Sequence, residues 1–297
     1  MIVDNEVIIK TSMVRVLFIC ILVLSLTGCV KLALRFSPSL IPRMTQALFE
    51  ECDPTLAQHS LPADLKLMEG LLKNDSKNKR LLTALCMGFT GYALLFVEDE
   101  DPERASQLYL RARDYGLRAF GLELGPLRGL KAEMNAIQKM LMGVSEAEHE
   151  ALFWTTMSWN AWIALNLHKP PALVQLETAQ AFLERVLELK PDYLYGAPYI
   201  LMGSILAGRP RVMGGDEAKA KENFEKAMAL SNRKFFLAHY YYARYYAVRV
   251  QNKELFFSLL KEVEGGPADK LREVCLINTV MKQKTIKLMT RSEDLFF

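Results

Sequence analysis

The stretch GFTGYALLFVEDEDPERASQLYLRAR, residues 88–113, decides the fold class of this chain. Apolar residues recur at helical spacing up to Val97 and again from Ala105 onward. Between the two runs stand four acidic residues and Pro102, a combination that ends one helix and starts another. The stretch therefore predicts a helical hairpin, which is two helices joined by a short turn.

The same organisation continues to the C-terminus. From Leu81 onward, apolar residues follow the i, i+3, i+4, i+7 spacing of amphipathic helices. Clusters of Pro, Gly and Asp interrupt this spacing at Glu98–Pro102, His168–Pro171, Arg209–Asp216 and Gly265–Pro267. With only 12 prolines and 16 glycines in 297 residues, we expect helices rather than a sandwich of many short strands.

The sizes of the apolar residues add a repeat to this pattern. In the tetratricopeptide repeat, small residues lie where paired helices approach closely, and large residues fill the space beside them. Four units match this pattern: Phe89, Tyr92, Ala93 and Phe96 with Ala105, Tyr109 and Ala112; Trp159, Trp162 and Asn166 with Ala179, Leu183 and Val186; Tyr199, Met202, Gly203 and Leu206 with Ala220, Phe224 and Ala227; and Tyr240, Ala243 and Ala247 with Phe256, Leu260 and Val263.

The fold class that follows is all-α. We predict a superhelical array of about four divergent tetratricopeptide-like helix pairs. The segment Ala268–Arg291 has no partner helix after it and is expected to be a C-terminal capping helix. Residues Leu40–Lys73 are expected to form a leading helical pair, with turns at Pro54 and Pro62.

Residues 1–28 have the features of an export signal. Lys10 and Arg15 precede the apolar run Val16–Leu24, which is shorter than the ~20 residues needed to span a bilayer. The sequence LTGC at 26–29 then resembles a bacterial lipoprotein signal. That resemblance implies cleavage before Cys29 and attachment of lipid to its thiol, with several acyl chains giving stable anchoring.

Two alternatives at the N-terminus stay open: an ordinary signal-anchor with an incidental cysteine, and a start at Met13 instead of Met1. Residues 29–297 are expected to form one domain that contacts the membrane through the lipid anchor only. Val30 occupies the position where an acidic residue would favour inner-membrane retention. By that resemblance, we expect anchoring at the periplasmic face of the outer membrane.

Composition and charge exclude several classes of protein. Hydrophobic residues make up 51% of the chain and charged residues 24%, which excludes a disordered chain and a polytopic membrane protein. Lys and Arg total 37 against 34 Asp and Glu, and no basic run exceeds two adjacent residues. We therefore expect no nucleic-acid partner, because phosphate binding depends on clustered basic side chains.

The chain has five cysteines, of which Cys20 lies in the predicted signal and Cys29 is the predicted lipid site. Three remain, an odd number for a disulfide framework. Cys86 and Cys275 lie on apolar helical faces and are expected to be small buried residues rather than ligands or nucleophiles. A disulfide that involves Cys52 stays open.

The stretches between and around the repeats carry a more specific resemblance. Gly88–Tyr92, Phe96–Ala105 and Tyr109–Arg113, together with Arg209–Asp216 and the following Ala218–Ala220 and Phe224–Ala227, resemble the TatT family, the tetratricopeptide-repeat lipoproteins associated with TRAP transporters. The resemblance covers essentially the whole mature chain. The family's ligand-contacting residues follow no motif that can be placed in this chain.

This resemblance implies a lipid-anchored periplasmic protein that forms a ring-like homotrimer. It also implies that each subunit docks the substrate-binding protein of a TRAP-type, ion-driven importer of organic acids or similar small ligands. The alternative function, which the repeats alone would support, is a tetratricopeptide scaffold for an envelope assembly or secretion complex.

The acidic run Glu98–Asp101 lacks the spacing of a calcium loop. It predicts a helix start instead, with Asp101 as N-cap, Pro102 at the first helical position and Glu103 near the positive helix end. The four histidines are scattered, so we expect no metal site. We also expect no cofactor and no enzymatic activity, because no catalytic motif is visible.

The Arg209–Asp216 loop offers two arginines and two glycines just before a helix, which is one way to build an anion nest. The candidate residues are Arg209, Arg211, Gly214 and Gly215. The alternative is a long loop that needs glycine backbone angles, with Asp216 capping the next helix.

Aromatic residues supply the candidate groove. Tyrosines cover more than half of the circumference of one helix, so some of their rings are expected to line a groove or a subunit contact, and the alternative is that all lie in the core. Trp154, Trp159 and Trp162 form one broad face, which is typical of a core but can also line a ligand groove. The candidate groove residues are Tyr240, Tyr241, Tyr242, Tyr245, Trp159 and Trp162.

Overall fold

The computed structural model describes residues 39–122 and 130–296, together with Arg15. The described residues are almost entirely helical and include no strand, which confirms the all-α prediction. The predicted signal peptide and Cys29 lie outside the described residues. The longer helices are α2 (Leu40–Phe49), α3 (Pro54–Asn74), α4 (Lys79–Tyr92), α5 (Pro102–Ala119), α6 (Leu130–Gly143), α7 (His149–Leu165), α9 (Leu176–Leu189), α10 (Tyr193–Gly208), α11 (Glu217–Leu230), α13 (Lys253–Gly265) and α14 (Cys275–Thr290).

Short helical segments complete the chain. Two of them are π-helical turns that extend a longer helix: η1 (Ala93–Val97) continues α4, and η5 (Tyr242–Ala247) continues α12 (Phe236–Tyr241). The others are α8 (Pro170–Leu173) and the 3₁₀ turns η3 (Glu146–Glu148), η4 (Arg211–Met213), η6 (Ala268–Val274) and η7 (Ser292–Asp294).

The helices pair as the sequence predicts. α4 with η1 packs on α5, α7 packs on α9, α10 packs on α11, and α12 with η5 packs on α13. The second-helix markers of the four pairs, Ala105, Ala179, Ala220 and Phe256, all have no exposed surface. Three of these markers are alanines, which let the paired helices approach closely, and in the fourth pair the large Phe256 takes this position.

Two helix starts form as predicted. The Asp101 side chain accepts a hydrogen bond from the backbone N–H of Arg104 at 3.0 Å, and Pro102 takes the first helical position. Asp216 does the same for α11, accepting from the N–H of Lys219 at 3.0 Å. Each carboxylate satisfies a backbone donor that the first helical turn leaves without a partner.

Pro62 does not mark a turn, contrary to the sequence prediction. It lies inside α3, which runs without a break from Pro54 to Asn74. The turn of the leading pair falls earlier, at Glu51–Asp53, where the Asp53 side chain caps α3 by accepting from the backbone of Thr55 and Leu56. The C-terminal cap begins as the 3₁₀ turn η6 and only then becomes α14.

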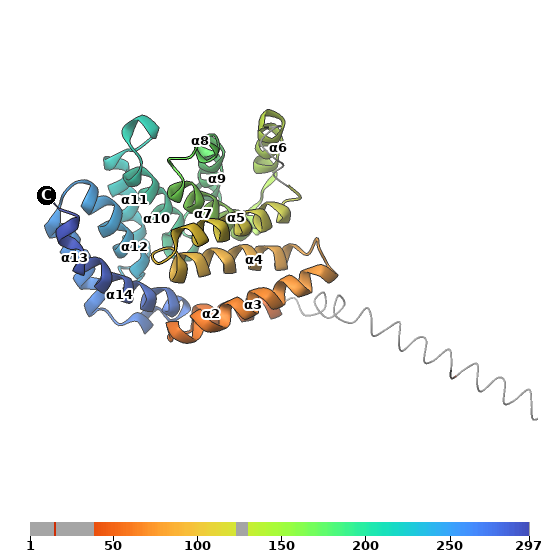
Figure 1. Cartoon of the computed structure of the whole chain (residues 1–297), viewed down its shortest axis with the longest axis horizontal. Helices are drawn as coiled ribbons and strands as arrows, with labels where there is room; N and C mark the ends of the chain where they lie inside the picture. Colours follow the sequence, from red (N-terminus) through yellow and green to blue (C-terminus); the bar gives the residue numbers. More distant parts are fainter. Residues whose placement is uncertain (1–14, 16–38, 123–129, 297) are drawn as a thin grey trace, which may run out of the picture.

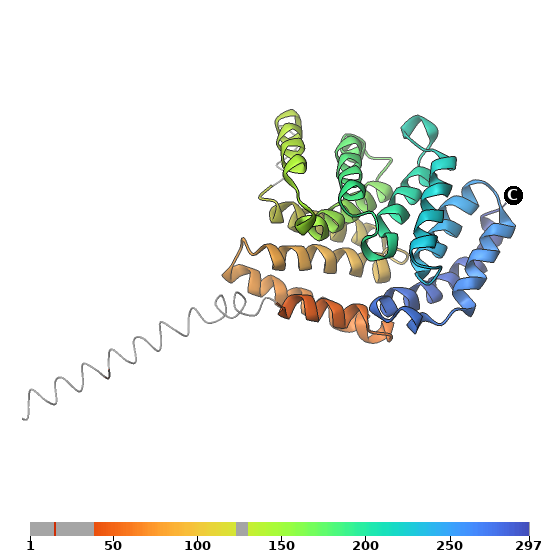
Figure 2. The ribbon, with the colours of Figure 1, turned by 180° about the vertical axis from the view of Figure 1, so that it is seen from behind.

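The two ends of the described chain meet. α14 packs on α12 and α13, which precede it, and also on α2 and α3 at the start of the chain. Figures 1 and 2 show the orange N-terminal helices beside the blue C-terminal ones from both sides. The helices thus close around a central space instead of forming an open row.

A disulfide bond between Cys52 and Cys275 fastens this closure. Cys275 is buried, as predicted, and the disulfide that the sequence left open for Cys52 forms with it. The pairing could not be read from the sequence, because the two cysteines become neighbours only once α14 folds back on the α2–α3 turn. Cys86 is free and fully buried, as predicted. Burial raises the pKa of its thiol to about 12, so it is neutral and unreactive at neutral pH.

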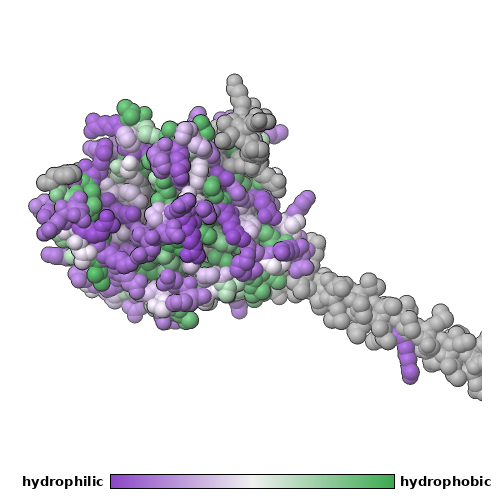
Figure 3. Space-filling model, in the orientation of Figure 1, coloured by the Kyte–Doolittle hydropathy of each residue, from purple (hydrophilic) through white to green (hydrophobic). Residues whose placement is uncertain are grey.

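The outer surface is mixed but mainly hydrophilic on the face drawn in Figure 3. The continuous helix from Lys79 to Val97 is long and apolar enough to cross a membrane by composition. However, 72% of that apolar window is buried inside the fold, which is typical of the core helix of a globular protein.

Candidate functional site

A cavity of about 460 Å³ lies at the centre of the closed array. This volume falls within the range of small-molecule sites, roughly 300–1,000 Å³, and is about three times that of an apolar cavity that holds benzene, about 150 Å³. Its walls come from α2, α3, α4, η1, α7, α10, α12, η5 and α14, so nearly every repeat contributes. Because these elements come from both ends of the chain, the cavity depends on the closure described above.

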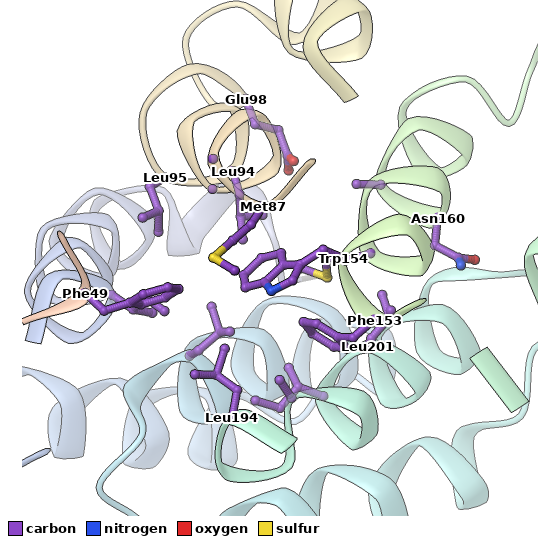
Figure 4. Close-up of a pocket in the computed structure, with 18 of the residues that line it drawn as sticks. Phe49, Met87, Leu94, Leu95, Glu98, Phe153, Trp154, Asn160, Leu194 and Leu201 are labelled. Atoms are coloured by element: carbon purple, nitrogen blue, oxygen red, sulfur yellow. The ribbon is translucent and has the colours of Figure 1, made fainter. Parts of the chain in front are cut away.

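Apolar side chains dominate the central part of the cavity. Figure 4 shows Phe49 on one side and Phe153 and Trp154 on the other, with leucines and Met87 between them. The rings of Phe49 and Trp154 are 6.3 Å apart, and those of Phe153 and Trp154 are 5.1 Å apart. The indole N–H of Trp154 donates to the Tyr193 hydroxyl at 3.1 Å, so its ring is held in place without the help of a ligand.

An unusual backbone turn positions one wall. At the start of α10, Leu194, Tyr195 and Gly196 have φ angles of 46°, 57° and 84°. The left-handed region is costly for residues with a side chain, and such geometry is often found at binding sites. Figure 4 shows the result, which is that Leu194 projects toward the aromatic cluster.

The two π-helical turns lie where the first and last repeats meet. In η1, the backbone N–H of Glu98 bonds to the carbonyl of Ala93 at 2.8 Å, and the Leu94 carbonyl is left to accept from Lys284 Nζ at 2.9 Å. Bulges of this kind re-aim side chains and occur often at functional sites. Here they bring Leu94, Leu95, Tyr241 and Tyr245 to the cavity wall.

Six polar lining residues are linked to one another by contacts and charge interactions and define the polar end of the cavity: Glu98, Arg244, Tyr241, Tyr245, Asn160 and Arg209. Thr45, Asp64 and Ser204 also line the cavity. Glu98 accepts from the buried Tyr109 hydroxyl at 2.5 Å, and Arg244 donates to Asp99 at 3.0 Å and to the Tyr240 hydroxyl at 3.2 Å. Burial alone would lower the pKa of Arg244, but the neighbouring tyrosines and Glu98 raise it overall. Arg244 therefore keeps its positive charge, which the neighbouring carboxylates of Asp99 and Glu98 compensate.

The Tyr241 and Tyr245 hydroxyls have no hydrogen-bond partner among the described residues. Burial raises the pKa of Tyr245 to about 12 and that of Tyr241 well above its usual value, and Glu98 adds to both effects. Both hydroxyls therefore keep their protons at neutral pH and are available as hydrogen-bond donors to a molecule in the cavity.

Arg209 is the cation without a counterion at this end. Only 8% of its surface is exposed, and its one side-chain hydrogen bond to another described residue goes to Asn160 Oδ1 at 3.4 Å. No described carboxylate lies within ion-pair distance of its guanidinium group. Burial alone lowers its pKa, without any carboxylate to offset the effect.

The structure brings together only some of the candidate site residues. Tyr241, Tyr245 and Arg209 line the cavity. Tyr240 is bonded to Arg244, while Tyr242 stacks on Phe224 with ring centroids 4.9 Å apart, and neither lines it. Trp159 and Trp162 are core residues, 1% and 7% exposed, beneath the Arg113 guanidinium.

The structure also divides the four candidate residues of the anion loop between different places. Arg211 is exposed on η4, lies 3.6 Å from Glu217 and is not among the residues that line the cavity. Gly214 has a φ of 88°, and an added Cβ at Gly215 would lie 2.0 Å from the Arg209 carbonyl. The glycines therefore serve the turn itself, and of the four candidate residues only Arg209 reaches the cavity.

Several lining residues have no signal in the sequence. Met87 and Leu194 have the same apolar character as residues of the core, and helical spacing cannot distinguish a cavity wall from a helix contact. Trp154 belongs to the tryptophan face considered above, and it is the one tryptophan of that face that lines the cavity among the described residues. Asn160 is visible as a polar residue within the apolar run of α7, and that was the one available signal. In Figure 4 it lies on the side of α7 that is away from Phe49.

Comparison with known proteins assigns the chain to a family. Residues 50–296 match the family model TAtT, described as TRAP transporter T-component. The chain belongs to this family. As a T-component it is associated with TRAP transport and with the cell envelope, and the family is a transporter-associated component, not a known enzyme family.

A relative gives more distant support. An uncharacterised protein of Treponema pallidum strain Nichols is 27% identical over 197 residues, which covers 61% of this T-component and 61% of the relative. The alignment thus spans less than two thirds of either chain.

Proposed function

We propose that this T-component binds a small apolar or amphipathic molecule in its central cavity and docks a TRAP substrate-binding protein, so that it assists solute uptake. The observation that carries the proposal is the cavity, which has an apolar centre, a polar end and a volume suited to a small molecule. Family membership supports the choice of a TRAP substrate-binding protein as partner.

The proposal places this protein in the periplasm as a lipoprotein. Its parts are lipid attachment at Cys29, anchoring in the outer membrane and assembly as a homotrimer. The LTGC sequence and Val30 support the first two parts, and the family resemblance supports the third.

A pull-down from detergent-solubilised envelopes tests the two binding claims together. Mass spectrometry would identify the captured proteins and the small molecules extracted with them. We expect a TRAP substrate-binding protein and an apolar or amphipathic compound. Recovery of envelope assembly factors alone, with no extracted compound, would replace the transport function with the scaffold function.

A cavity-filling variant tests whether the compound occupies the cavity. Gly91 lines it, and a Cβ built at Gly91 meets no other heavy atom within 4 Å, so Gly91→Leu can fill the space without disturbing the wall. The matched control is Gly70→Leu, because Gly70 is an equally unobstructed helical glycine on the outside of α3. Only Gly91→Leu should lower the amount of compound recovered.

A further inference from the structure

Resting on the proposed cavity function, we infer that Arg209 binds an anionic head group, a carboxylate, of a single-chain amphiphile whose tail lies in the apolar centre of the cavity. This names the chemical class of the ligand and one residue that selects it. The inference rests on three features of the described residues: an unneutralised buried cation, two unpaired hydroxyls, and an apolar continuation of the same space.

The first feature is the charge balance at the polar end. Arg244 and Lys284 both pair with Asp99, and Glu98 holds the Tyr109 hydroxyl. Arg209 has only the amide oxygen of Asn160, a neutral acceptor at 3.4 Å. A buried guanidinium that has lost most of its water is costly unless an anion compensates it. An anion that enters the cavity would supply that compensation.

The second feature is the position of the hydrogen-bond donors. Gly208, the residue before Arg209, lies against the Tyr245 ring, because a Cβ built at Gly208 would be 3.8 Å from Tyr245 Cδ1. Tyr245 stacks on Tyr241 with ring centroids 5.4 Å apart. Arg209 and the two tyrosines therefore line adjacent parts of one cavity. A carboxylate can accept hydrogen bonds from the Arg209 guanidinium and from both hydroxyls, whereas a protonated amine cannot pair with the guanidinium.

The third feature is the apolar part of the cavity. Beyond the polar end, the lining passes through Leu201 and Trp154 to Phe49 and Met44 on the N-terminal helices. The polar side chains that line the cavity on these N-terminal helices are Thr45 and Asp64, and the Trp154 N–H is already bonded to Tyr193. No cation that could pair with a second anionic group is among the described lining residues of these helices. A polyanionic ligand would leave charge in this region, so one acidic head and one hydrocarbon tail fit best.

The test compares two probes of equal chain length, dodecanoate and 1-dodecanol, on the delipidated mature protein by isothermal titration calorimetry. We expect wild type to bind dodecanoate at least tenfold more tightly than dodecanol. Arg209→Gln should weaken dodecanoate binding roughly 10- to 100-fold, the range for a hydrogen bond to a charged group. Dodecanol affinity should change less than about threefold.

Two further variants control for folding and for general charge. Arg209→Lys keeps the positive charge and should retain a preference for the acid over the alcohol, which a purely structural role for Arg209 would not predict. Arg211→Gln alters a neighbouring exposed arginine and should change neither affinity.

The outcomes separate the inference from the proposed function. If both probes bind equally to wild type, or if Arg209→Gln leaves the preference for the acid intact, the inference is wrong and the apolar cavity function stands. If neither probe binds, or if Gly91→Leu has no effect on binding, the proposed function and the inference both fail.

Discussion

Asp99, in the turn between η1 and α5, accepts a hydrogen bond from Lys284 of α14, which lies 185 residues further along the chain. The same carboxylate accepts from Arg244 of η5 at 3.0 Å. One aspartate thus connects the first repeat to the last repeat and to the capping helix. Because the cavity walls come from all three, the closure that Asp99 supports is also what encloses the cavity.

Asp99→Asn should lower the free energy of unfolding by about 1–3 kcal/mol at pH 7, because Lys284, with a side chain only 11% exposed, loses its anion. Burial would raise the pKa of Asp99, but the charges and hydrogen bonds of Lys284 and Arg244 outweigh it and hold the pKa below its usual value. Wild type therefore gains stability above the unfolded-state pKa of about 4 and loses it as the pH falls through the lower folded value.

Urea titrations at pH 7, 5, 4 and 3.5 measure this difference. Glu100→Gln is the control. Glu100 pairs with Lys287, which lies in α14 like Lys284, but the side chains of both Glu100 and Lys287 are more than half exposed. Its effect should stay below about 1 kcal/mol. An Asp99→Asn deficit that persists unchanged at pH 3.5 would contradict the electrostatic explanation.

The disulfide between Cys52 and Cys275 gives a second, covalent route to the same closure. Its partners are separated by 223 residues, so a reduced chain gains much unfolded-state freedom. Cys52→Ser should therefore lower the free energy of unfolding by about 2–4 kcal/mol. Thermal unfolding with and without reductant checks this, because reductant should destabilise wild type and leave Cys52→Ser unchanged. Equal sensitivity of the two proteins would show that another bond is being reduced.

The repeat units were predictable, and the closure of the array was not. Ala105 and Tyr109 follow a local pattern of small and large residues. Such a pattern predicts contacts with the neighbouring helix only. Lys284 and Cys275 contact residues that are far away in the sequence, and these contacts form only when the first and last helices pack together. No local spacing of residues predicts that packing. Arg209 could be named as a candidate because charged residues in a glycine-rich loop stand out. Met87 and Leu194 could not, because a cavity wall and a core have the same composition.

Close packing of the first two repeats gives a third prediction. A Cβ added at Gly116 of α5 would lie 2.0 Å from Thr155 Oγ1 of α7 and 3.0 Å from the Cys86 sulfur of α4. Gly116→Ala should lower the free energy of unfolding by about 1–3 kcal/mol, because the added methyl group overpacks this contact. Gly70→Ala, in an unobstructed position of α3, should instead stabilise by up to about 1 kcal/mol through helix propensity. Equal urea midpoints for the two variants would contradict this view of the three-helix contact.

The left-handed turn that directs Leu194 into the cavity gives the last prediction. Gly196 has a φ of 84°, and a Cβ added there would lie 3.1 Å from the Ala227 Cα of α11. Gly196→Ala should therefore lower the free energy of unfolding by about 1–2 kcal/mol through backbone strain, and lower it further through the clash.

Gly214→Ala is the matched control, because Gly214 has a similar φ of 88° but an added Cβ there meets nothing within 4 Å. It should show the backbone cost alone. Only Gly196→Ala should also weaken 1-dodecanol binding, since the turn that it disturbs carries Leu194 in the cavity wall. If both variants lose equal stability and neither affects dodecanol binding, the turn at Gly196 does not shape the cavity.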